Sequence, residues 1–157
     1  MNPSIRIRRA GPKDADTLAR LRYRFRIELD PPTESETAFL KRCTPWMEQR
    51  LREGTWLCWM ALADDTAVGT IWLHIIQKLP NPVGHLDYHG YISSVYVMPE
   101  FRNAGIGAAL LRACLAHTEA EGIDALVLWP TERSRQLYER HGFAVQNDLL
   151  ERRGRTP

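Results

Sequence analysis

The stretch that decides the fold of this chain is Val95-Tyr-Val-Met-Pro-Glu-Phe-Arg-Asn-Ala-Gly-Ile-Gly-Ala-Ala-Leu-Leu111. It predicts a strand, a tight polar turn and the first turns of an apolar helix. Pro99 ends the strand because a proline cannot donate to a sheet ladder. Gly105 and Gly107 have no Cβ, so an oxyanion can approach their backbone closely. Backbone N–H groups at the positive end of a helix bind phosphate, and we therefore expect a ligand that carries a diphosphate.

Two linked motifs make this expectation more specific. The turn Arg102-x-x-Gly105-x-Gly107 resembles the acetyl-coenzyme A motif of the GNAT superfamily of N-acetyltransferases. Downstream, Thr131-Glu-Arg-Ser-Arg-Gln-Leu-Tyr-Glu-Arg-His-Gly-Phe143 is similar to the family segment N-x-x-A-x-x-L-Y-x-x-x-G-F. Two blocks in the right order are far more specific than either alone, and the resemblance is strong over residues 91–143. It implies an enzyme that moves an acetyl group from acetyl-coenzyme A directly to a primary amine.

The resemblance also implies which residues hold the cofactor. They lie at the end of the strand, in the glycine turn and in the second motif: Val95, Tyr96, Val97, Arg102, Asn103, Ala104, Gly105, Ile106, Gly107, Thr131, Ser134 and Tyr138. Thr131 and Ser134 stand where the family usually has asparagine and alanine. Their hydroxyls can still bond to the pantetheine arm, with fewer donors than an amide. A backbone N–H near Val97 would stabilise the oxyanion, again by resemblance.

Acetyl transfer to an amine needs a base for the amine proton and an acid for the leaving thiolate. Tyr138 aligns with the family tyrosine near the coenzyme A sulfur, and a phenol with a pKa of about 10 is protonated at neutral pH. Many family members carry a glutamate early on the strand before the glycine turn, where this chain has Tyr91. Histidine is the side chain whose ordinary pKa lies closest to neutrality, so His89 is the predicted base. A water relay without a dedicated base is an equal alternative.

The acceptor site is expected at two polar segments, the loop 78–90 and the end of the first helix, because loops on a rigid scaffold often carry specificity. The candidate acceptor residues are Glu28, Asp30, Asp87 and Tyr91, with His85 close by in the loop. The carboxylates favour a cationic acceptor. They make a small amine or a polyamine preferable to an acidic substrate, but an amino acid, a polyamine, an antibiotic and a protein amine all remain open.

Composition excludes several classes of protein. The chain has 157 residues, and one domain over 1–157 is expected. A net charge of +2 is too balanced to indicate nucleic-acid binding. Cys43, Cys58 and Cys114 match no metal or disulfide pattern, which favours a reducing compartment and no metal. No apolar run approaches the ~20 residues of a membrane span, so we expect a cytoplasmic protein without a membrane partner, and a homodimer is left open.

The pattern of elements predicts an α/β (α+β) fold. A mixed, mainly antiparallel sheet would be flanked by helices, and one parallel βαβ unit would carry the cofactor site. The resemblance implies that the two strands of this unit splay apart to admit the cofactor. A capping box at Thr33-Glu-Ser-Glu36 would start the second helix. Predicted strands cover 4–8, 56–63, 67–76, 91–98, 125–129 and a last one within 143–153; predicted helices cover 14–29, 33–52, 106–122 and a short segment that carries Tyr138 and ends at Gly142.

Two other classes of function remain open at this point. A non-catalytic acyl-coenzyme A binding or sensing module would keep the glycine turn and lack a base, and the missing carboxylate at Tyr91 is its best support. A generic nucleotide-binding domain would also fit a short G-x-G. The chain has neither a third glycine at the dinucleotide-binding spacing nor a P-loop, which disfavours that alternative.

Overall fold

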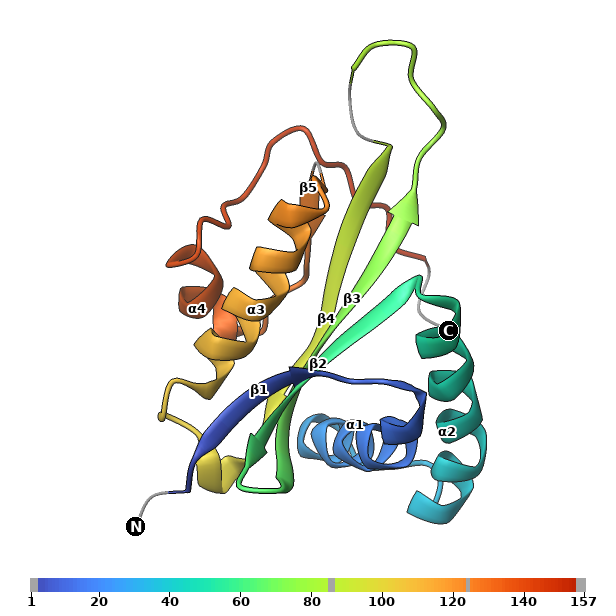
Figure 1. Ribbon diagram of the computed structural model, residues 1–157, viewed down its shortest axis with the longest axis vertical. Helices are drawn as coiled ribbons and strands as arrows, with labels where there is room; N and C mark the ends of the chain where they lie inside the picture. The colour runs from blue at the N-terminus through green and yellow to red at the C-terminus, as the bar shows by residue number, and fades with distance from the viewer. Residues whose placement is uncertain (1–2, 85–86, 124, 155–157) are drawn as a thin grey trace.

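A five-stranded sheet organises the chain, of which the computed structural model describes residues 3–84, 87–123 and 125–154 (Figure 1). The strands lie in the order β1-β2-β3-β4-β5. The first four pair antiparallel and β4 pairs with β5 parallel, which confirms the mixed sheet with one βαβ unit. The strands are β1 (Ile5–Arg9), β2 (Trp56–Ala63), β3 (Thr66–Gln77), β4 (Tyr88–Val97) and β5 (Ala125–Val127).

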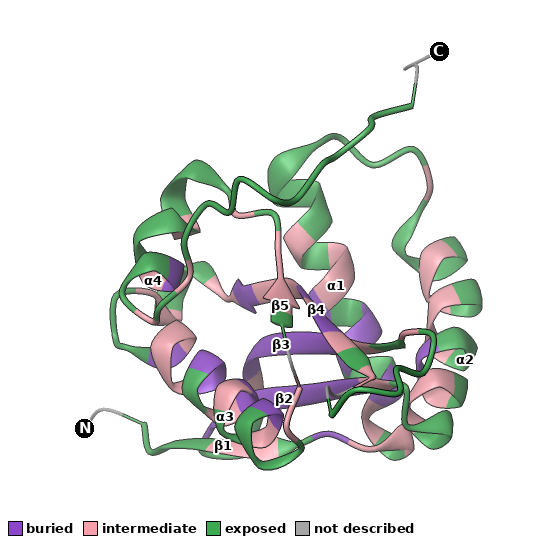
Figure 2. Ribbon diagram, turned by 90° about the horizontal axis from the view of Figure 1, so that it is seen from above, coloured by how far each residue is buried: buried purple, intermediate pink, exposed green. Residues whose placement is uncertain are grey.

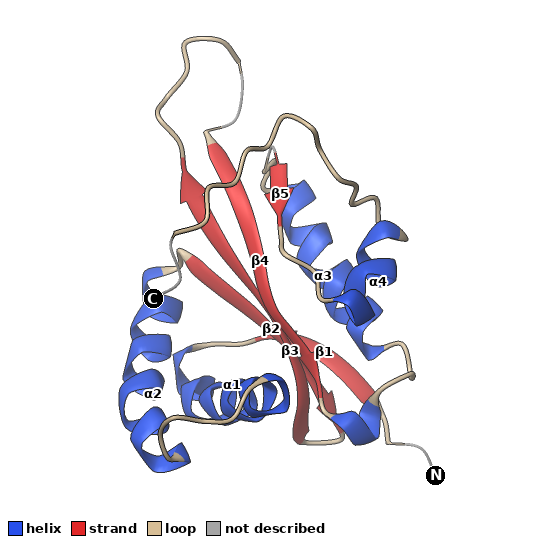
Figure 3. Cartoon of the chain, turned by 180° about the vertical axis from the view of Figure 1, so that it is seen from behind, coloured by secondary structure: helices blue, strands red, loops and turns tan. Residues whose placement is uncertain are grey.

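Helices cover both faces of this sheet (Figures 1 and 3). One face carries α1 (Ala15–Leu29) and α2 (Glu36–Glu53), and the other carries α3 (Ile106–Ala120) and α4 (Arg135–Glu139). Short 3-10 turns precede three of the helices: η1 (Pro12–Asp14), η2 (Pro99–Phe101) and η3 (Glu132–Ser134). Figure 2 shows the buried middle strands between the two helical layers. No helix in the described ranges is long and apolar enough to cross a membrane.

Each face of the sheet has its own hydrophobic cluster, because successive side chains of a strand alternate between the two faces. Ile71, Leu73 and Ile92 pack with Leu110 on the α3 side. Met60 and Trp72 pack with Leu18 on the α1 side, together with residues of α2. The middle strands are therefore apolar on both faces, and α1 and α3 are held on opposite sides of the same strands.

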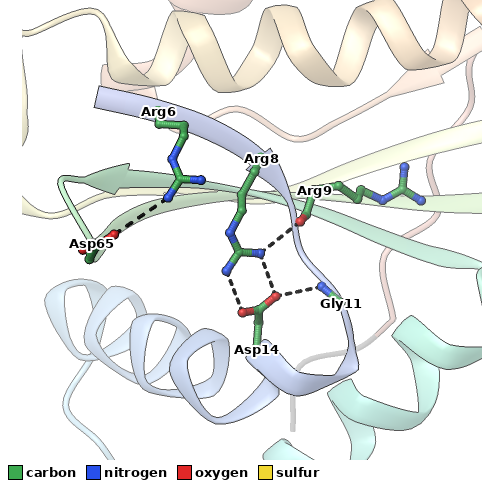
Figure 4. A network of polar contacts seen from close by, with 6 residues as sticks. All are labelled: Arg6, Arg8, Arg9, Gly11, Asp14 and Asp65. Atoms are coloured by element: carbon green, nitrogen blue, oxygen red, sulfur yellow. Dashed lines mark hydrogen bonds and ion pairs between the residues drawn. The ribbon is translucent and has the colours of Figure 1, made fainter. Parts of the chain in front are cut away.

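The junction between β1 and α1 is fixed by one carboxylate (Figure 4). Asp14 accepts two hydrogen bonds from the Arg8 guanidinium, at 2.9 and 2.8 Å, and a third from the Gly11 N–H at 2.8 Å. The Arg8 bonds lower the pKa of Asp14 against the opposing effect of burial. The neighbouring pair Arg6–Asp65, at 3.9 Å, is exposed and contributes little. Asp14 thus sets the entry of α1, whose far end reaches the candidate site.

The start of α2 differs from the predicted capping box. The N-cap is Ser35, whose hydroxyl accepts a hydrogen bond from the Ala38 N–H at 3.2 Å, so the assignment of the cap to Thr33 is wrong. The reason is tertiary: the Tyr23 hydroxyl donates to the Glu34 carbonyl at 3.2 Å and holds that residue ahead of the helix. Gly54 ends α2 with a φ of 77°, as its position predicts.

The C-terminal part differs more from the expected fold. The strand predicted for residues 125–129, buried on both faces, has only three residues, and these are half-buried or exposed. Residues 143–154 form no strand, so β5 is the edge of the sheet. The apolar side chains of Trp129, Val145, Leu149 and Leu150 are exposed there. An apolar run alone does not show whether a further strand covers it.

The end of α4 agrees with its sequence. The Phe143 N–H donates to the Tyr138 carbonyl at 3.1 Å, and the Gly142 N–H donates to the Glu139 carbonyl at 3.2 Å. Gly142 has a φ of 88°, so these bonds form a Schellman motif with glycine in the left-handed position. The rings of Tyr138 and Phe143 meet at 5.7 Å in an edge-to-face contact. The motif thus ends α4 just after Tyr138 and places Phe143 where its ring packs on the buried Tyr138 ring.

We predict that Gly69→Ala destabilises the fold. A Cβ at Gly69 would lie 2.9 Å from the Tyr96 carbonyl oxygen, which belongs to the neighbouring strand and cannot turn away. Overpacking of this kind costs about 1–3 kcal/mol. Urea unfolding checks this, with Gly84→Ala as the control because a Cβ there meets nothing within 4 Å. Equal stability of Gly69→Ala and wild type would contradict the close packing of β3 on β4.

Candidate active site

A β-bulge in β4 arranges the candidate site. Trp72 of β3 lies opposite Ser93, but Thr70, two residues away, lies opposite Tyr96, so β4 has one extra residue between them. Ser94 takes the strain with a φ of 50°. Because side chains alternate along a strand, the extra residue exchanges the two faces from that point on. Tyr96 therefore faces α1, as Ser93 does.

After the bulge, Val95 and Val97 pack on the α3 side of the sheet. Before the bulge, it is the even-numbered Ile92 that packs there. The backbone pairing of β4 with β5 ends at Tyr91 opposite Val127, while β4 continues to Val97. The two strands therefore separate after Tyr91, as the resemblance implies. The rings of Tyr91 and Trp129 meet at 5.5 Å where the opening begins.

The glycine turn follows at the end of this opening. Asn103 and Gly105 have positive φ angles of 61° and 76°, and Gly105 is the N-cap of α3. The first hydrogen bond of the helix runs from the Ala109 N–H to the Gly105 carbonyl at 3.0 Å. The N–H groups before Ala109 have no acceptor inside the helix and lie at the positive end of its dipole. The turn therefore presents donors to an anion.

A cavity of about 290 Å³ lies beside the turn. Most of the predicted cofactor residues line it: Val95, Val97, Arg102, Asn103, Gly105, Ile106, Gly107 and Ser134. Phe101, Arg133 and Leu137 also line it and are not among the residues expected from the sequence. Arg133 lies inside the second motif, between Thr131 and Ser134. Its position between two predicted cofactor residues could have identified it as a cofactor residue from the sequence.

Four of the predicted cofactor residues do not line this cavity. Tyr96 faces α1 because of the bulge, and its hydroxyl donates to Glu28 at 2.7 Å. Ala104 is exposed in the turn. Thr131 caps η3, and its hydroxyl lies 2.8 Å from that of Ser134. Tyr138 is 6% exposed and lines a second cavity, of about 330 Å³, between β5, α4 and the C-terminal segment.

The side chain of Arg102 is engaged within the protein and is not a free cation. Its Nε donates to the Val97 carbonyl at 2.8 Å, and its Nη2 donates to Glu28 at 2.6 Å. Burial alone would raise the pKa of Glu28, but hydrogen bonds from Arg102 and Tyr96 hold it below its ordinary value. Glu28 thus links the end of α1 to the glycine turn, and the charge of Arg102 is neutralised. Arg133 is the other guanidinium at the cavity.

Two phenols of the site have strongly raised pKa values. Burial, with the hydrogen bond to the Glu28 carboxylate second, raises the pKa of Tyr96 to about 12. Burial also raises the pKa of Tyr138 to about 12, against the smaller opposing effect of a hydrogen bond with Ser134. Both side chains are therefore protonated at neutral pH, and a proton on Tyr138 is available for donation.

The structure does not bring the predicted acceptor residues together. Glu28 contacts Tyr96 near the end of β4, whereas Asp87 directly precedes the start of that strand. A strand of this length spans about 30 Å, and Figure 1 shows the loop before β4 at the far end of the sheet from the glycine turn. Asp30 pairs with Arg26 at 3.3 Å. Asp87 accepts a bond from the Asn81 N–H at 3.2 Å, which shapes its own loop.

Of the two histidines named from the sequence, the structure describes only His89. His89 lies in β4, two residues before the opening, and pairs with Ala125 of β5. It stands opposite Ile76, as Tyr91 stands opposite His74, so both point to the α1 side of the sheet. His85 lies outside the described residues.

Neither a metal nor a thiol is prominent at this site. In the ranges described, no three His, Cys, Asp or Glu side chains gather where they could hold a metal ion. Cys114 is fully buried in the core, as its helical position predicts, and burial raises the pKa of its thiol to about 12. A thiol of this kind is a poor nucleophile because little thiolate forms.

Comparison with known proteins agrees with this geometry. The acetyltransferase (GNAT) family matches residues 18–143. A mycothiol acetyltransferase of Frankia alni is 31% identical over 111 residues, which are 68% of this chain and 32% of the relative. An uncharacterized N-acetyltransferase of Archaeoglobus fulgidus is 27% identical over 150 residues, 92% of both chains. The chain thus spans about a third of the Frankia alni protein, and about a quarter (25%) of a second mycothiol acetyltransferase, from Propionibacterium freudenreichii.

Solved structures share the fold over nearly the whole chain. A GCN5-related N-acetyltransferase from Ralstonia eutropha is 27% identical, with a TM-score of 0.78 over 95% of this chain and 98% of that one. An acetyltransferase from Clostridium acetobutylicum solved with acetyl-CoA has a TM-score of 0.81 over 96% of both chains, but at 22% identity it shows the fold alone. The matched family spans most of the chain and includes both the β4 opening and the glycine turn, so this protein belongs to the GNAT family of acetyltransferases.

Proposed function

We propose that this acetyltransferase uses acetyl-coenzyme A and transfers the acetyl group directly to a primary amine. One observation carries the proposal: the glycine turn at the start of α3 lines a cavity of about 290 Å³ that continues along Val95 and Val97, on the part of β4 that has no β5 partner. Donors for a diphosphate and free strand-edge groups for an amide-bearing arm thus lie side by side.

The residues of the cavity fit the cofactor part by part. The N–H groups of residues 103–107 would bind the diphosphate, with Arg133 as the nearby cation. The unpaired edge of β4 would bond the pantetheine amides as a neighbouring strand does. When bound, the cofactor supplies an activated acetyl thioester. A backbone N–H of the same edge, near Val97, would donate to the carbonyl oxygen as it becomes negative.

Tyr138 is the proposed acid for the leaving thiolate. Its pKa of about 12 keeps the phenol protonated. It sits one turn after Ser134, which lines the cavity beside the glycine turn, and its ring packs edge-to-face on Phe143. A donor that is already held in position loses little entropy when it acts.

The amine would lose its proton to His89 or to a water relay. His89 points to the same side of the sheet as Tyr91 and Ser93, the side covered by α1 and α2. The cofactor loop belongs to the other side, with α3. We therefore propose that the acceptor approaches from the α1 side and meets the thioester in the opening between β4 and β5.

A second candidate is a non-catalytic acyl-coenzyme A sensing module. The specific observation in its favour is Tyr91, which stands where a carboxylate would serve as base and packs its ring on Trp129. Release of free thiol from acetyl-coenzyme A in the presence of an amine panel separates the two. Tight cofactor binding without amine-dependent release would support the module. Displacement of coenzyme A by adenine nucleotides alone would instead indicate a generic nucleotide site.

We predict that Gly107→Glu abolishes coenzyme A binding while Gly107→Ala retains it. A Cβ at Gly107 meets only Leu137 Cδ2, at 3.5 Å, so a methyl group fits without strain. A glutamate adds bulk and a negative charge at the point where the diphosphate is proposed to bind. Calorimetric titration with coenzyme A measures the effect, and thermal unfolding shows that both variants are folded. Unchanged affinity in folded Gly107→Glu would refute this placement of the diphosphate.

We predict that Tyr138→Phe lowers kcat by about 10²–10⁴-fold, the usual contribution of a general acid, with little change in coenzyme A affinity. The phenyl ring keeps the packing on Phe143 and removes only the proton donor. Because the pKa of Tyr138 lies well above the ordinary 10.0, loss of this proton causes no decline in wild-type kcat below pH 10. Exposed Tyr88 provides the control Tyr88→Phe. A kcat equal to wild type, with chemistry limiting the rate, would assign Tyr138 to packing alone.

A further inference from the structure

Arg22 projects from the middle of α1 toward the bulge of β4. Its Nη1 donates to the Ser94 hydroxyl at 2.7 Å, and its guanidinium lies 5.8 Å from the centre of the Phe25 ring. The side chain is half-buried, and burial lowers the pKa of the guanidinium. An arginine nevertheless stays charged at neutral pH. A permanent, partly desolvated cation therefore lies against the strand that borders the opening.

No carboxylate neutralises this cation within the described part of the chain. Its hydrogen-bond and ring partners there are the Ser94 hydroxyl and the Phe25 ring. The neutral Cys43 thiol and Tyr91 phenol lie close enough to act on its charge. No Asp or Glu oxygen of the described residues forms an ion pair with it within 4.0 Å. A desolvated charge without a counterion is costly. An anion brought from outside would remove that cost, and none of the proposed steps of acetyl transfer supplies one here.

The acids near the end of α1 are already engaged. Asp30 pairs with Arg26 at 3.3 Å, Glu34 forms an ion pair with Arg42, and Glu28 holds the glycine turn. None of these carboxylates is left to attract a cationic amine. The expectation of a cationic acceptor rests also on Asp87, which lies in a different loop. At this end of α1, however, the charge that remains uncompensated is positive.

A cavity of about 300 Å³ lies between the end of α1 and the start of α2, and Arg22 lines it. The two ion pairs just described line the same cavity, and their charges cancel. Arg22 thus leaves one net positive charge. One charge matches one carboxylate, whereas a phosphate dianion would require a second free cation. The planar guanidinium also matches the two oxygens of a carboxylate in a forked arrangement.

The position of Arg22 also limits the size of the molecule. The opening between β4 and β5 begins after Tyr91, and Ser94, which Arg22 touches, lies three residues further along β4. Three residues of a strand span about 10 Å. Ser94 thus lies about 10 Å past the last β4–β5 pair, within the unpaired part of β4. A carboxylate held by Arg22 beside Ser94 would place the amine, a few bonds away, in the same opening, where the thioester is proposed to lie.

We propose that the acceptor is a small amine that also carries a carboxylate, as an amino acid does, and that Arg22 binds this carboxylate. This inference rests on the proposed function and adds the class of acceptor to it. The competing structural role is that Arg22 only fixes the bulge through Ser94. The two roles differ in what happens when the hydroxyl is removed and the guanidinium is kept.

The test measures thiol release from acetyl-coenzyme A with matched acceptor triplets. Each triplet contains an amino acid, its amide and its decarboxylated amine, for example L-phenylalanine, L-phenylalaninamide and phenethylamine, or L-leucine, L-leucinamide and isoamylamine. We expect kcat/KM for the carboxylate member to exceed that of its amide by about 10–100-fold, the range for a charge-assisted hydrogen bond. Most of the difference should be in KM, because Arg22 holds the acceptor and does not act on the thioester.

Four variants assign the preference to Arg22. Arg22→Gln should remove the preference for the carboxylate member. Arg22→Lys should keep part of it, because lysine retains the charge but lacks the two-pronged guanidinium. Ser94→Ala should keep it, since the guanidinium remains. Arg20→Gln is the control on the same helix, because Arg20 is exposed and pairs with Asp16 on the surface. If Ser94→Ala loses the preference as fully as Arg22→Gln does, Arg22 acts only through the bulge and the inference is overturned.

A binding measurement covers the case in which no triplet is turned over. Thermal unfolding in saturating coenzyme A is then compared with N-acetyl-L-phenylalanine and N-acetyl-L-phenylalaninamide, the product forms of one triplet. Stabilisation by the acid alone, lost in Arg22→Gln, supports the inference. A preference for the amide or amine members, or none in either measurement, overturns it. Failure to bind coenzyme A at all is a different result, because it overturns the proposed function itself.

Discussion

The β-bulge at Ser94 is the constraint on which the rest of the site depends. One extra residue in β4 exchanges the two faces of the strand, so Val95 and Val97 line the cavity beside the glycine turn while Tyr96 turns toward α1. The Thr70 hydroxyl donates to the Ser94 carbonyl at 3.3 Å, and Arg22 donates to the Ser94 side chain. Both contacts hold a residue whose φ of 50° is unfavourable for a serine. Without the extra residue, the alternation would continue unbroken and would turn Val95 and Val97 toward α1.

The second organising contact is the link from α1 to the glycine turn. Glu28 accepts from both Arg102 and Tyr96, so a residue of the first helix fixes the loop that is proposed to hold the diphosphate. Arg22, less than two turns earlier on the same helix, reaches the bulge. Through these two contacts, α1 on one face of the sheet holds both the bulge and the glycine turn that leads to α3 on the other face. The bidentate pair of Asp14 and Arg8 lies at the opposite end of this helix and sets where the helix begins.

Much of the fold and part of the site could be predicted because their causes are local. The glycine turn depends on Pro99, Gly105 and the apolar residues after it, and all of these signals lie within one stretch of chain. The end of α4 depends on Gly142 and Phe143, four and five residues after Tyr138, and a Schellman motif needs nothing further away. The hairpin of β2 and β3 follows from two strand patterns with a short turn between them. Most residues named for the cofactor consequently line one cavity.

Other features depend on contacts between residues that are distant in the sequence, and only the tertiary structure decided them. Nothing in Ser93-Ser94 by itself indicates that β4 has one residue more than its partner, because a bulge is a property of the pair of strands. Glu28 is named from the sequence as free to bind an acceptor, but Arg102 lies 74 positions away and neutralises it. Arg22 is one of several arginines on α1 in the sequence, and burial against β4 distinguishes it from the exposed ones. The sequence by itself determined the family, the glycine turn and the helix that carries Tyr138, because these arise from neighbouring residues. Long-range packing decided which charges pair and which side of the sheet each side chain points to.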